Sequence, residues 1–208
     1  MARPRQTLLT RQRIVEAASA LVDAEGLDAL SMRRLATELG VQGPSLYNHF
    51  ATKAEIVDAV ADAVIAQVDV SAFALHKWDE ALRHWAFSYR AVLVAHPNVV
   101  PVLAQGPGRR PGGLAMAEAV YGALVDAGWS YARATHIGAL MRYLVTGSAL
   151  GSFALGFDAD PQLYERYPHL HQAPRLAEHH EAVDEGAFEL GLDLLITGLT
   201  ARYEMGTR

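Results

Sequence analysis

The feature that most constrains this chain is the stretch from Ser31 to Lys53, which reads SMRRLATELGVQGPSLYNHFATK. Its first half predicts a short helix, because Leu35 and Leu39 recur at helical spacing behind Ser31, a residue type favoured at the N-cap. Gly40 then supplies a residue that tolerates the left-handed conformation in which many helices end. The stretch therefore begins with a short amphipathic helix and a tight turn.

A second short helix is predicted directly after this turn. Pro44 suits its first turn, where the missing backbone N–H costs nothing, and Leu46 and Phe50 give the helix one inward face. A helix this short does not stabilise itself, so its polar face is presented to a partner. Two helices joined in this way are typical of a helix-turn-helix, whose second helix enters the major groove of DNA.

The segment upstream predicts a third helix for the same domain. Thr10 is a suitable N-cap, and the apolar residues Ile14, Ala18 and Leu21 share one face of the helix that follows it. Gly26 marks the end of this helix. The N-terminal part of the chain is therefore predicted to be a three-helix DNA-binding domain.

This region resembles the DNA-binding domain of the tetracycline-repressor (TetR) family of bacterial transcription regulators through the run LSMRRLATELGVQGPSLYNHFATKAEIVDAV. The resemblance implies groove-facing positions and phosphate contacts. The groove-facing positions are Arg33, Gly43, Pro44, Tyr47 and Asn48, and the phosphate contacts are Ser31, Ser45, Tyr47, His49 and Lys53. Arg33 is the best candidate for a base reader, because its guanidinium can pair with both acceptors of a guanine edge. Gly43 stands where the tetracycline repressors have a base-reading side chain, so base readout is expected to rest more on Arg33, Pro44 and Asn48.

Charge is distributed unevenly along the chain. Residues 1–53 carry a net charge of +2 and the remainder −7, within a total of −5. This asymmetry indicates that the N-terminal module meets phosphate. Residues 1–13 hold no acid and form either a solubilising tail or an arm that contacts the minor groove or the DNA backbone. The four arginines of this arm are Arg3, Arg5, Arg11 and Arg13.

Length and composition leave room for a larger second domain. With 208 residues, 51% of them hydrophobic, the chain can bury a core beyond residue 52. The absence of cysteine excludes disulfides, thiolate metal sites and cysteine nucleophiles, and it agrees with a cytoplasmic location. Neither a signal peptide nor a run of about eighteen apolar residues is present, so no membrane partner is expected.

Helical periodicity continues to the C-terminus, and nothing reads as a strand. We therefore expect an all-α protein with domains over 1–52 and 53–208, the second of which starts with a connecting helix over 53–69. The further helices are expected over 78–95, 114–127, 130–155 and 185–204, and the loops over 105–113 and 156–184.

The C-terminal part resembles the ligand-binding and dimerisation domain of the tetracycline repressors in the segments WDEALRHWAFSYRAVLVAHP, LVDAGWS, LVTGSALG and FELGLDLLITGL. The resemblance implies a homodimer in which the last two long helices, here 131–155 and 185–204, form a four-helix bundle with those of the partner. Small residues at the crossings would let these helices approach closely. The candidates for the dimer interface are Gly147, Gly151, Gly191 and Gly198.

The same resemblance implies a small-molecule effector in the second domain. The candidate ligand-binding residues are Trp85, Tyr89, Leu103, Met116, Val120, Tyr121, Met141, Tyr143 and Phe153. Aromatic and methionine side chains at helical spacing are also ordinary core residues, so both interpretations stay open for each of them.

The expected effector is not tetracycline. Members that bind it hold a magnesium chelate through histidines and amides, and this chain has Leu103 and Tyr143 in place of two histidines, Trp85 in place of an asparagine and Val120 in place of a glutamine. The chelate's partners are therefore missing. We expect a largely hydrophobic or aromatic effector, and no cofactor and no metal.

Other classes of function are less well supported. His169, His171, His179 and His180 are irregularly spaced in an expected surface loop, which favours a solvated linker over a metal site. The run GSALG at 147–151 lacks the pattern of a nucleophile elbow, and GPGRRPGG lacks the ending of a phosphate-binding loop, so no enzyme is expected.

The sequence thus predicts a ligand-responsive repressor that binds a palindromic, double-stranded DNA operator as a homodimer. The alternatives are a ligand-responsive activator and an architectural DNA-binding protein. The last would be net basic, whereas the pI here is about 6.0.

Overall fold

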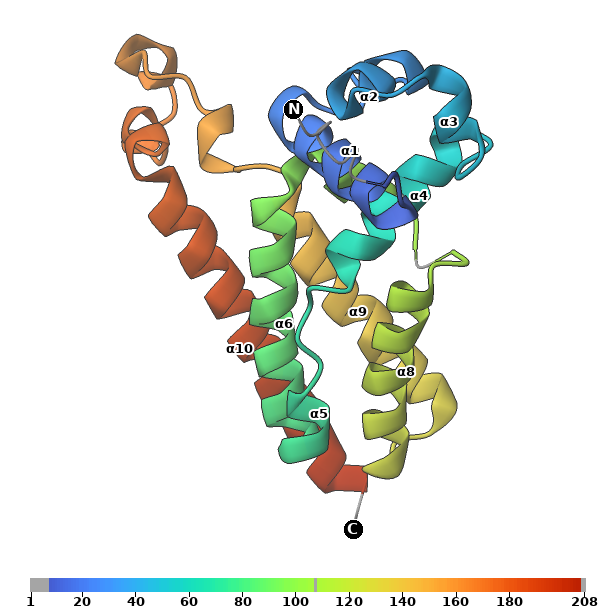
Figure 1. The fold of residues 1–208 in the computed structure, drawn as a ribbon. Coiled ribbons are helices and arrows are strands. Elements are labelled where there is room, and N and C mark those ends of the chain that lie inside the picture. The colour runs from blue at the N-terminus through green and yellow to red at the C-terminus, as the bar shows by residue number, and fades with distance from the viewer. Residues whose placement is uncertain (1–7, 107, 207–208) are drawn as a thin grey trace. The chain divides into compact units, whose positions relative to one another are not determined.

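The computed structural model describes residues 8–106 and 108–206, and within these ranges every regular element is a helix (Figure 1). This confirms the expected all-α fold. The α-helices are α1 (Arg11–Glu25), α2 (Met32–Leu39), α3 (Gly43–Tyr47), α4 (Lys53–Ile65), α5 (Ala72–Leu75), α6 (Trp78–Ala95), α7 (Val100–Ala104), α8 (Pro111–Asp126), α9 (Tyr131–Ala149) and α10 (His180–Gly206).

The chain packs as two compact units, and each unit is built from two separate stretches of the sequence. Unit 1 consists of Met1–Gln67 and His96–Ala115, and unit 2 of Val68–Ala95 and Met116–Arg208. Helices α1, α2 and α3 thus pack together with α4, α7 and the start of α8. The functional boundary expected at residue 53 remains a prediction, because a packing unit is not a functional module.

Local capping determines where the first helices of unit 1 begin and end. The side chains of Thr10 and Ser31 accept hydrogen bonds from the backbone N–H groups of Arg13 and Arg34, at 3.2 and 3.1 Å. Gly40 ends α2 in the left-handed conformation, with φ +66°. The caps expected from the sequence are therefore confirmed.

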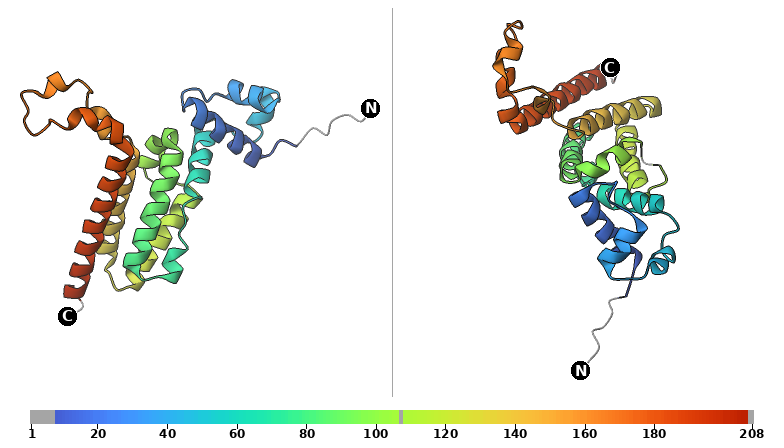
Figure 2. Two further views of the ribbon diagram at one scale, coloured as in Figure 1. Left: turned by 90° about the vertical axis from the view of Figure 1, so that its left-hand side faces the viewer. Right: turned by 90° about the horizontal axis from the view of Figure 1, so that it is seen from above.

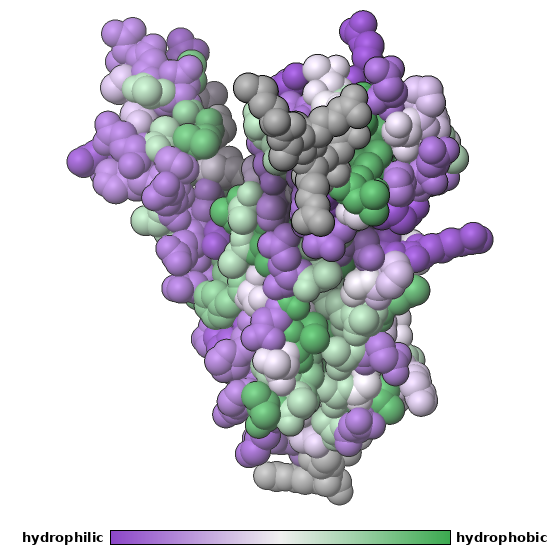
Figure 3. Space-filling view, viewed as in Figure 1, coloured by the Kyte–Doolittle hydropathy of each residue, from purple (hydrophilic) through white to green (hydrophobic). Residues whose placement is uncertain are grey.

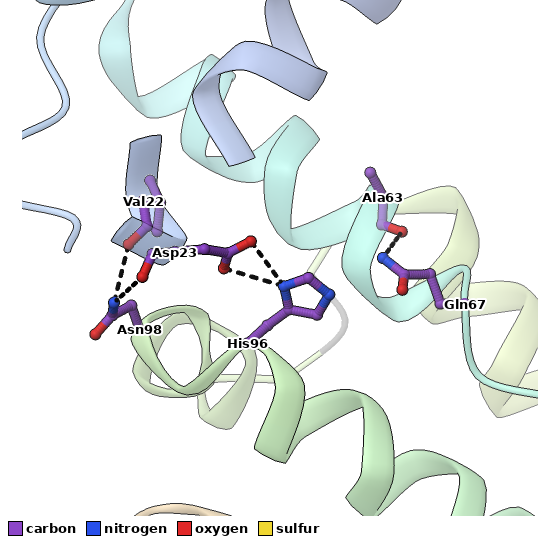
Figure 4. A network of polar contacts seen from close by, with 6 residues as sticks. All are labelled: Val22, Asp23, Ala63, Gln67, His96 and Asn98. Atoms are coloured by element: carbon purple, nitrogen blue, oxygen red, sulfur yellow. Dashed lines mark hydrogen bonds and ion pairs between the residues drawn. The ribbon is translucent and has the colours of Figure 1, made fainter. Parts of the chain in front are cut away.

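The side chains of His96 and Asn98 connect segment 96–115 to α1 through polar contacts (Figure 4). His96 Nδ1 lies 3.0 Å from both carboxylate oxygens of Asp23. Asn98 Nδ2 donates hydrogen bonds to the backbone carbonyl oxygens of Val22 and Asp23, at 2.9 and 3.2 Å. These oxygens belong to the last turn of α1, where most backbone acceptors lack partners within the helix. The Val22 oxygen also accepts the Gly26 N–H at 2.8 Å, so Asn98 adds a second donor there and provides a donor to the Asp23 oxygen.

The same segment is fastened to α4 further along. Arg110 donates from Nε and Nη2 to Asp58 Oδ1, at 3.1 and 3.0 Å, and the backbone N–H of Gly112 donates to Asp62 Oδ1 at 2.7 Å. A Cβ atom on Gly112 would lie 2.9 Å from this oxygen. Glycine is therefore what allows the start of α8 to approach α4 this closely.

Unit 2 is built around α6, which packs against α9 and α10 (Figures 1 and 2). Its lower end holds an aromatic cluster of Trp78, Trp129 and Tyr203, with each pair of ring centroids 5.4 Å apart. The Tyr203 hydroxyl also donates to the Ala127 carbonyl oxygen at 2.7 Å. Helices α6 and α10 and the turn between α8 and α9 are thereby connected at one end of the unit.

Several expected helix boundaries are wrong. Helix α9 ends at Ala149 rather than near residue 155, because Ser152 Oγ accepts a hydrogen bond from the Leu155 N–H, which favours a local turn over a continued helix. Helix α8 begins at Pro111 rather than 114, since proline is compatible with a first helical turn. Helix α4 ends at Ile65 rather than near residue 69.

The expected loop over 156–184 contains more structure than its polarity suggests. It holds short 3₁₀ turns over Pro161–Tyr164, Ala173–Arg175 and Ala177–His179, and α10 starts within it at His180. Figure 3 shows mainly hydrophilic residues over the projecting part of this loop. Among the described residues, no group of three or more His, Cys, Asp or Glu side chains is placed to hold a metal ion.

Candidate DNA-binding surface and effector residues

The turn between α2 and α3 is fixed by buried side chains on both helices. Leu35 and Leu46 have no exposed surface, and Phe50 is only 1% exposed. These residues pack into the core of unit 1 and leave the opposite faces of both helices in solvent. The polar positions that the sequence assigned to DNA lie on or near these solvent faces.

The two adjacent arginines of α2 have different environments. Arg34 Nη2 lies 2.7 Å from Glu25 Oε1, and Arg34 Nη1 lies 3.9 Å from Glu38 Oε2. The hydrogen bond with Glu25 and the charge of its carboxylate raise the pKa of Arg34. Arg33 is exposed, and among the described residues its guanidinium has no recorded partner. The geometry therefore leaves Arg33, and not Arg34, available to an outside acceptor.

The other predicted DNA contacts are accessible to different degrees. Tyr47 is 55% exposed, Pro44 and Asn48 are also exposed, and Ser45 and His49 are half-buried. Gly43 starts α3 without a positive φ, so its backbone does not require glycine. Whether any of these residues touches DNA stays a prediction.

Lys53 and Arg11 both have contacts inside unit 1. Lys53 Nζ donates to the Leu27 carbonyl oxygen at 2.9 Å. Arg11 donates to the His49 carbonyl oxygen, and its guanidinium carbon lies 3.9 Å from the centroid of the Phe50 ring. Arg11 thus stabilises the packing of α1 against the residues that follow α3.

The predicted N-terminal arm is therefore shorter than residues 1–13. Helix α1 starts at Arg11, so Arg11 and Arg13 belong to a helix. Arg3 and Arg5 lie outside the described residues.

The structure also groups residues that the sequence did not single out. A shallow depression between α2 and α3 is lined by Arg33 and Tyr47, and in addition by Thr37 and Gln42. The sequence held one signal for Gln42: it precedes a short helix at the N-cap position, where glutamine is an unusual choice.

Four of the predicted effector residues lie in the interior of unit 2. Trp85, Tyr89, Val120 and Met141 are at most 3% exposed. The Trp85 and Tyr89 ring centroids are 5.5 Å apart. Trp85 Nε1 is buried and has no hydrogen-bond partner among the described residues. A buried donor without an acceptor costs roughly 1–3 kcal/mol, so this N–H is suited to meet an acceptor brought from outside.

Three further effector candidates, Met116, Tyr121 and Leu103, differ in their exposure and in the unit to which they belong. Met116 is half-buried and Tyr121 is 37% exposed. The Tyr121 ring packs against Gly138 of α9, where a Cβ atom would collide with ring atom Cε1. Leu103 is buried, but it belongs to unit 1.

Tyr143 and Phe153 are not grouped with the buried candidates. They are 72% and 71% exposed, and they line a groove beside α10 together with Gly147 and Gly151. Two residues predicted for the effector thus share a surface with two predicted for the dimer interface.

The four glycines predicted for the dimer interface fall into two classes. A Cβ atom on Gly147, Gly151 or Gly198 would meet no other atom within 4 Å, so these positions face open space within a single chain. A Cβ atom on Gly191 would lie 3.1 Å from Leu144 Cδ1, so this glycine permits close packing of α10 on α9 of the same chain.

Two family models match the chain. The model of the bacterial regulatory proteins of the tetR family matches residues 14–60, and the model of the tetracyclin repressor-like C-terminal domain matches residues 74–203. Together they cover the helix-turn-helix and nearly all of unit 2. Within the described residues, no helix is both long and apolar enough to cross a membrane.

Individual relatives agree with these models. The tetracycline repressor protein class A from transposon 1721 of Escherichia coli is 33% identical over 207 residues, which cover 94% of this chain and 93% of the repressor. Apo ActR from Streptomyces coelicolor has a similar structure, with a TM-score of 0.78 at 31% identity over 96% of this chain and 99% of ActR. ActR in complex with actinorhodin gives a TM-score of 0.73 at 30% identity, over 95% and 99% of the two chains.

Proposed function

This chain belongs to the TetR family of bacterial regulatory proteins, and on that premise we propose that it represses transcription as a homodimer released from its operator by a small, largely apolar or aromatic effector. The family makes it a DNA-binding transcription regulator and not an enzyme. The repressor role, the symmetry of the operator and the class of effector are our proposals.

The observation that carries the proposal is the unpaired guanidinium of Arg33 on an exposed face of the helix-turn-helix. The Arg34 guanidinium is engaged with Glu25, whereas the Arg33 guanidinium has no partner among the described residues. An arginine fork is complementary to the two acceptors of a guanine edge in the major groove. Lys53 and Tyr47 add a cation and a hydroxyl on the same unit, which suit phosphate contacts.

A homodimer is supported by the surface of α9 and α10. Leu140 and Tyr143 on α9 and Leu190 and Leu194 on α10 are between 46% and 72% exposed. Gly147 faces open space on the same helix as Leu140. Large apolar side chains in solvent mark a surface that a partner covers, and a second copy of this chain is the partner that a two-fold operator requires.

The effector class follows from the residues at the family's ligand positions. Trp85 and Val120 provide buried apolar surface, and Leu103 offers no nitrogen to a magnesium ion. The complex of the related ActR with actinorhodin supports a ligand-sensing role for this type of domain. We infer a molecule with an extensive apolar or aromatic surface and few polar groups.

Footprinting on the DNA upstream of the protein's own gene tests this function. We expect two half-sites related by two-fold symmetry, with centres about one helical turn apart. Addition of the protein to an in vitro transcription reaction from that promoter should lower the transcript level. A single unsymmetrical half-site would contradict the dimeric mode of binding, and a rise in transcript would identify an activator.

A further inference from the structure

The depression between α2 and α3 has an apolar floor and polar edges. Ala36 is buried beneath it, whereas Arg33, Gln42 and Tyr47, which also line it, are exposed. The depression thus combines a surface that excludes water with side chains that can form directional hydrogen bonds. Such a surface can receive the edge of a planar partner.

Gln42 occupies the N-cap of α3 but does not cap the helix. In the same unit, Thr10, Ser31 and Thr52 each accept a hydrogen bond from the helix that they precede. Gln42 forms no such bond, and within the described ranges its amide has no recorded partner. Glutamine is not among the favoured N-cap residues. Capping therefore does not account for this side chain.

Gly43 keeps the depression open beside Gln42. Its φ is not positive, and a Cβ atom there would meet no other atom within 4 Å. Neither backbone conformation nor packing in this chain requires glycine at this position. The missing side chain removes an obstacle at the start of α3, where a ligand or base edge could approach the backbone.

We propose that Gln42 is a base-reading residue, which selects an A·T pair next to the G·C pair that Arg33 selects. The Gln42 amide carries one donor and one acceptor, which match N7 and the N6 amino group of adenine in the major groove. Arg33 lines the same depression and matches N7 and O6 of guanine. The inference rests on the proposed placement of α3 in the major groove.

Selection of binding sites from randomised DNA by the full-length protein tests the proposal. The wild-type protein defines the half-site, and each of its base pairs is then replaced in turn and the affinity measured for Gln42→Ala, Gln42→Glu and Gln67→Ala. Gln67→Ala is the matched control, because Gln67 follows α4 and donates to the Ala63 carbonyl oxygen of its own helix (Figure 4).

Gln42→Ala should lose a preference of about 5- to 150-fold for adenine at one position of each half-site, the range expected for one bidentate contact. The dependence of affinity on salt should not change, because the amide is uncharged. Gln42→Glu should shift the preference at that position towards cytosine, whose N4 amino group a carboxylate accepts. Gln67→Ala should retain the wild-type preferences.

Two results would overturn the proposal. One is a Gln42→Ala protein that melts like wild type and keeps every base preference. The other is an equal loss of affinity on selected and random DNA, which would make Gln42 a positioning residue. If the wild-type protein itself enriches no sequence, then the proposed function fails, and this outcome is distinct because it does not depend on any variant.

Discussion

The side-chain ammonium of Lys53 donates a hydrogen bond of 2.9 Å to the backbone carbonyl oxygen of Leu27. This bond holds the lysine at the start of α4 and leaves its other N–H groups free to meet a phosphate. We expect Lys53→Ala to weaken binding to all DNA sequences alike and to reduce the slope of log affinity against log salt concentration by about one.

The control for this prediction is Lys77→Ala, which removes a lysine of unit 2. Titrations at several salt concentrations, on operator and on random DNA, give the slope for each protein. An unchanged slope for Lys53→Ala would show that Lys53 serves only to hold Leu27.

Replacement of Arg33 by alanine and replacement of Arg34 by alanine should have different effects on the base preference of the protein. Arg33→Ala should cost about 1–3 kcal/mol of binding free energy on the operator and relax one base position, because it removes a bidentate base contact. Arg34→Ala should leave the base preferences unchanged, because Arg34 is paired with Glu25. Affinities on a set of operators with single base changes check this, and equal relaxation by both variants would contradict it.

Gly147→Leu should dissociate or destabilise the proposed homodimer. The position faces open space within one chain, so any clash must come from a second copy. The matched control is Gly122→Leu, another helical glycine with open space around its Cβ position. Sedimentation velocity gives the mass of each variant, and a Gly147→Leu protein with unchanged mass and melting temperature would place this residue away from the interface.

Gly138→Ala should destabilise unit 2 even though alanine favours helix. The added methyl group collides with the Tyr121 ring, and overpacking of this kind costs about 1–3 kcal/mol. Because Tyr121→Ala removes the ring, the double variant should recover the stability lost through Gly138→Ala. Chemical denaturation of the four proteins of this cycle gives the coupling energy, and additive effects would contradict the contact.

Tetracycline with magnesium should not release this protein from its operator. Leu103 provides no metal ligand, and Trp85 and Val120 place apolar bulk where a chelate needs polar partners. Titration should leave tryptophan fluorescence and operator affinity unchanged, whereas a fitting aromatic ligand should alter both. Comparison with Trp85→Phe separates the fluorescence of Trp85 from that of Trp78 and Trp129, which lie together in another cluster. Release by micromolar tetracycline would refute the inferred effector class.

Local chemistry explains which parts of the fold could be predicted from the sequence. Thr10, Ser31 and Gly40 act through bonds to residues a few positions away, so their roles are readable without tertiary structure. Helix α6 is bounded as expected at Ala95, ahead of Pro97. Helices α5 and α7 span only four and five residues, too few for a periodic pattern to emerge.

The rest depends on contacts between distant residues. Tyr143 and Trp85 are both aromatic residues at helical spacing, and no local signal shows that the first is 72% exposed and the second 2%. The pairing of Arg34 with Glu25 likewise joins two helices. A sequence can therefore nominate Arg33 as a base reader, but only the structure explains why its neighbour is unavailable.

The hydrogen bonds from Asn98 to the last turn of α1 have a consequence for protein engineering. A chimeric regulator joins the DNA-binding part of one protein to the sensing part of another. The expected domain boundary at residue 53 and the end of the first stretch of unit 1 at residue 67 are two places for such a cut. Either cut would separate α1 from His96 and Asn98, and a cut at residue 67 would also separate α4 from Arg110, because these three residues come from segment 96–115. A transplanted DNA-binding part should therefore carry this segment with it, or the recipient should supply equivalent side chains at the same places.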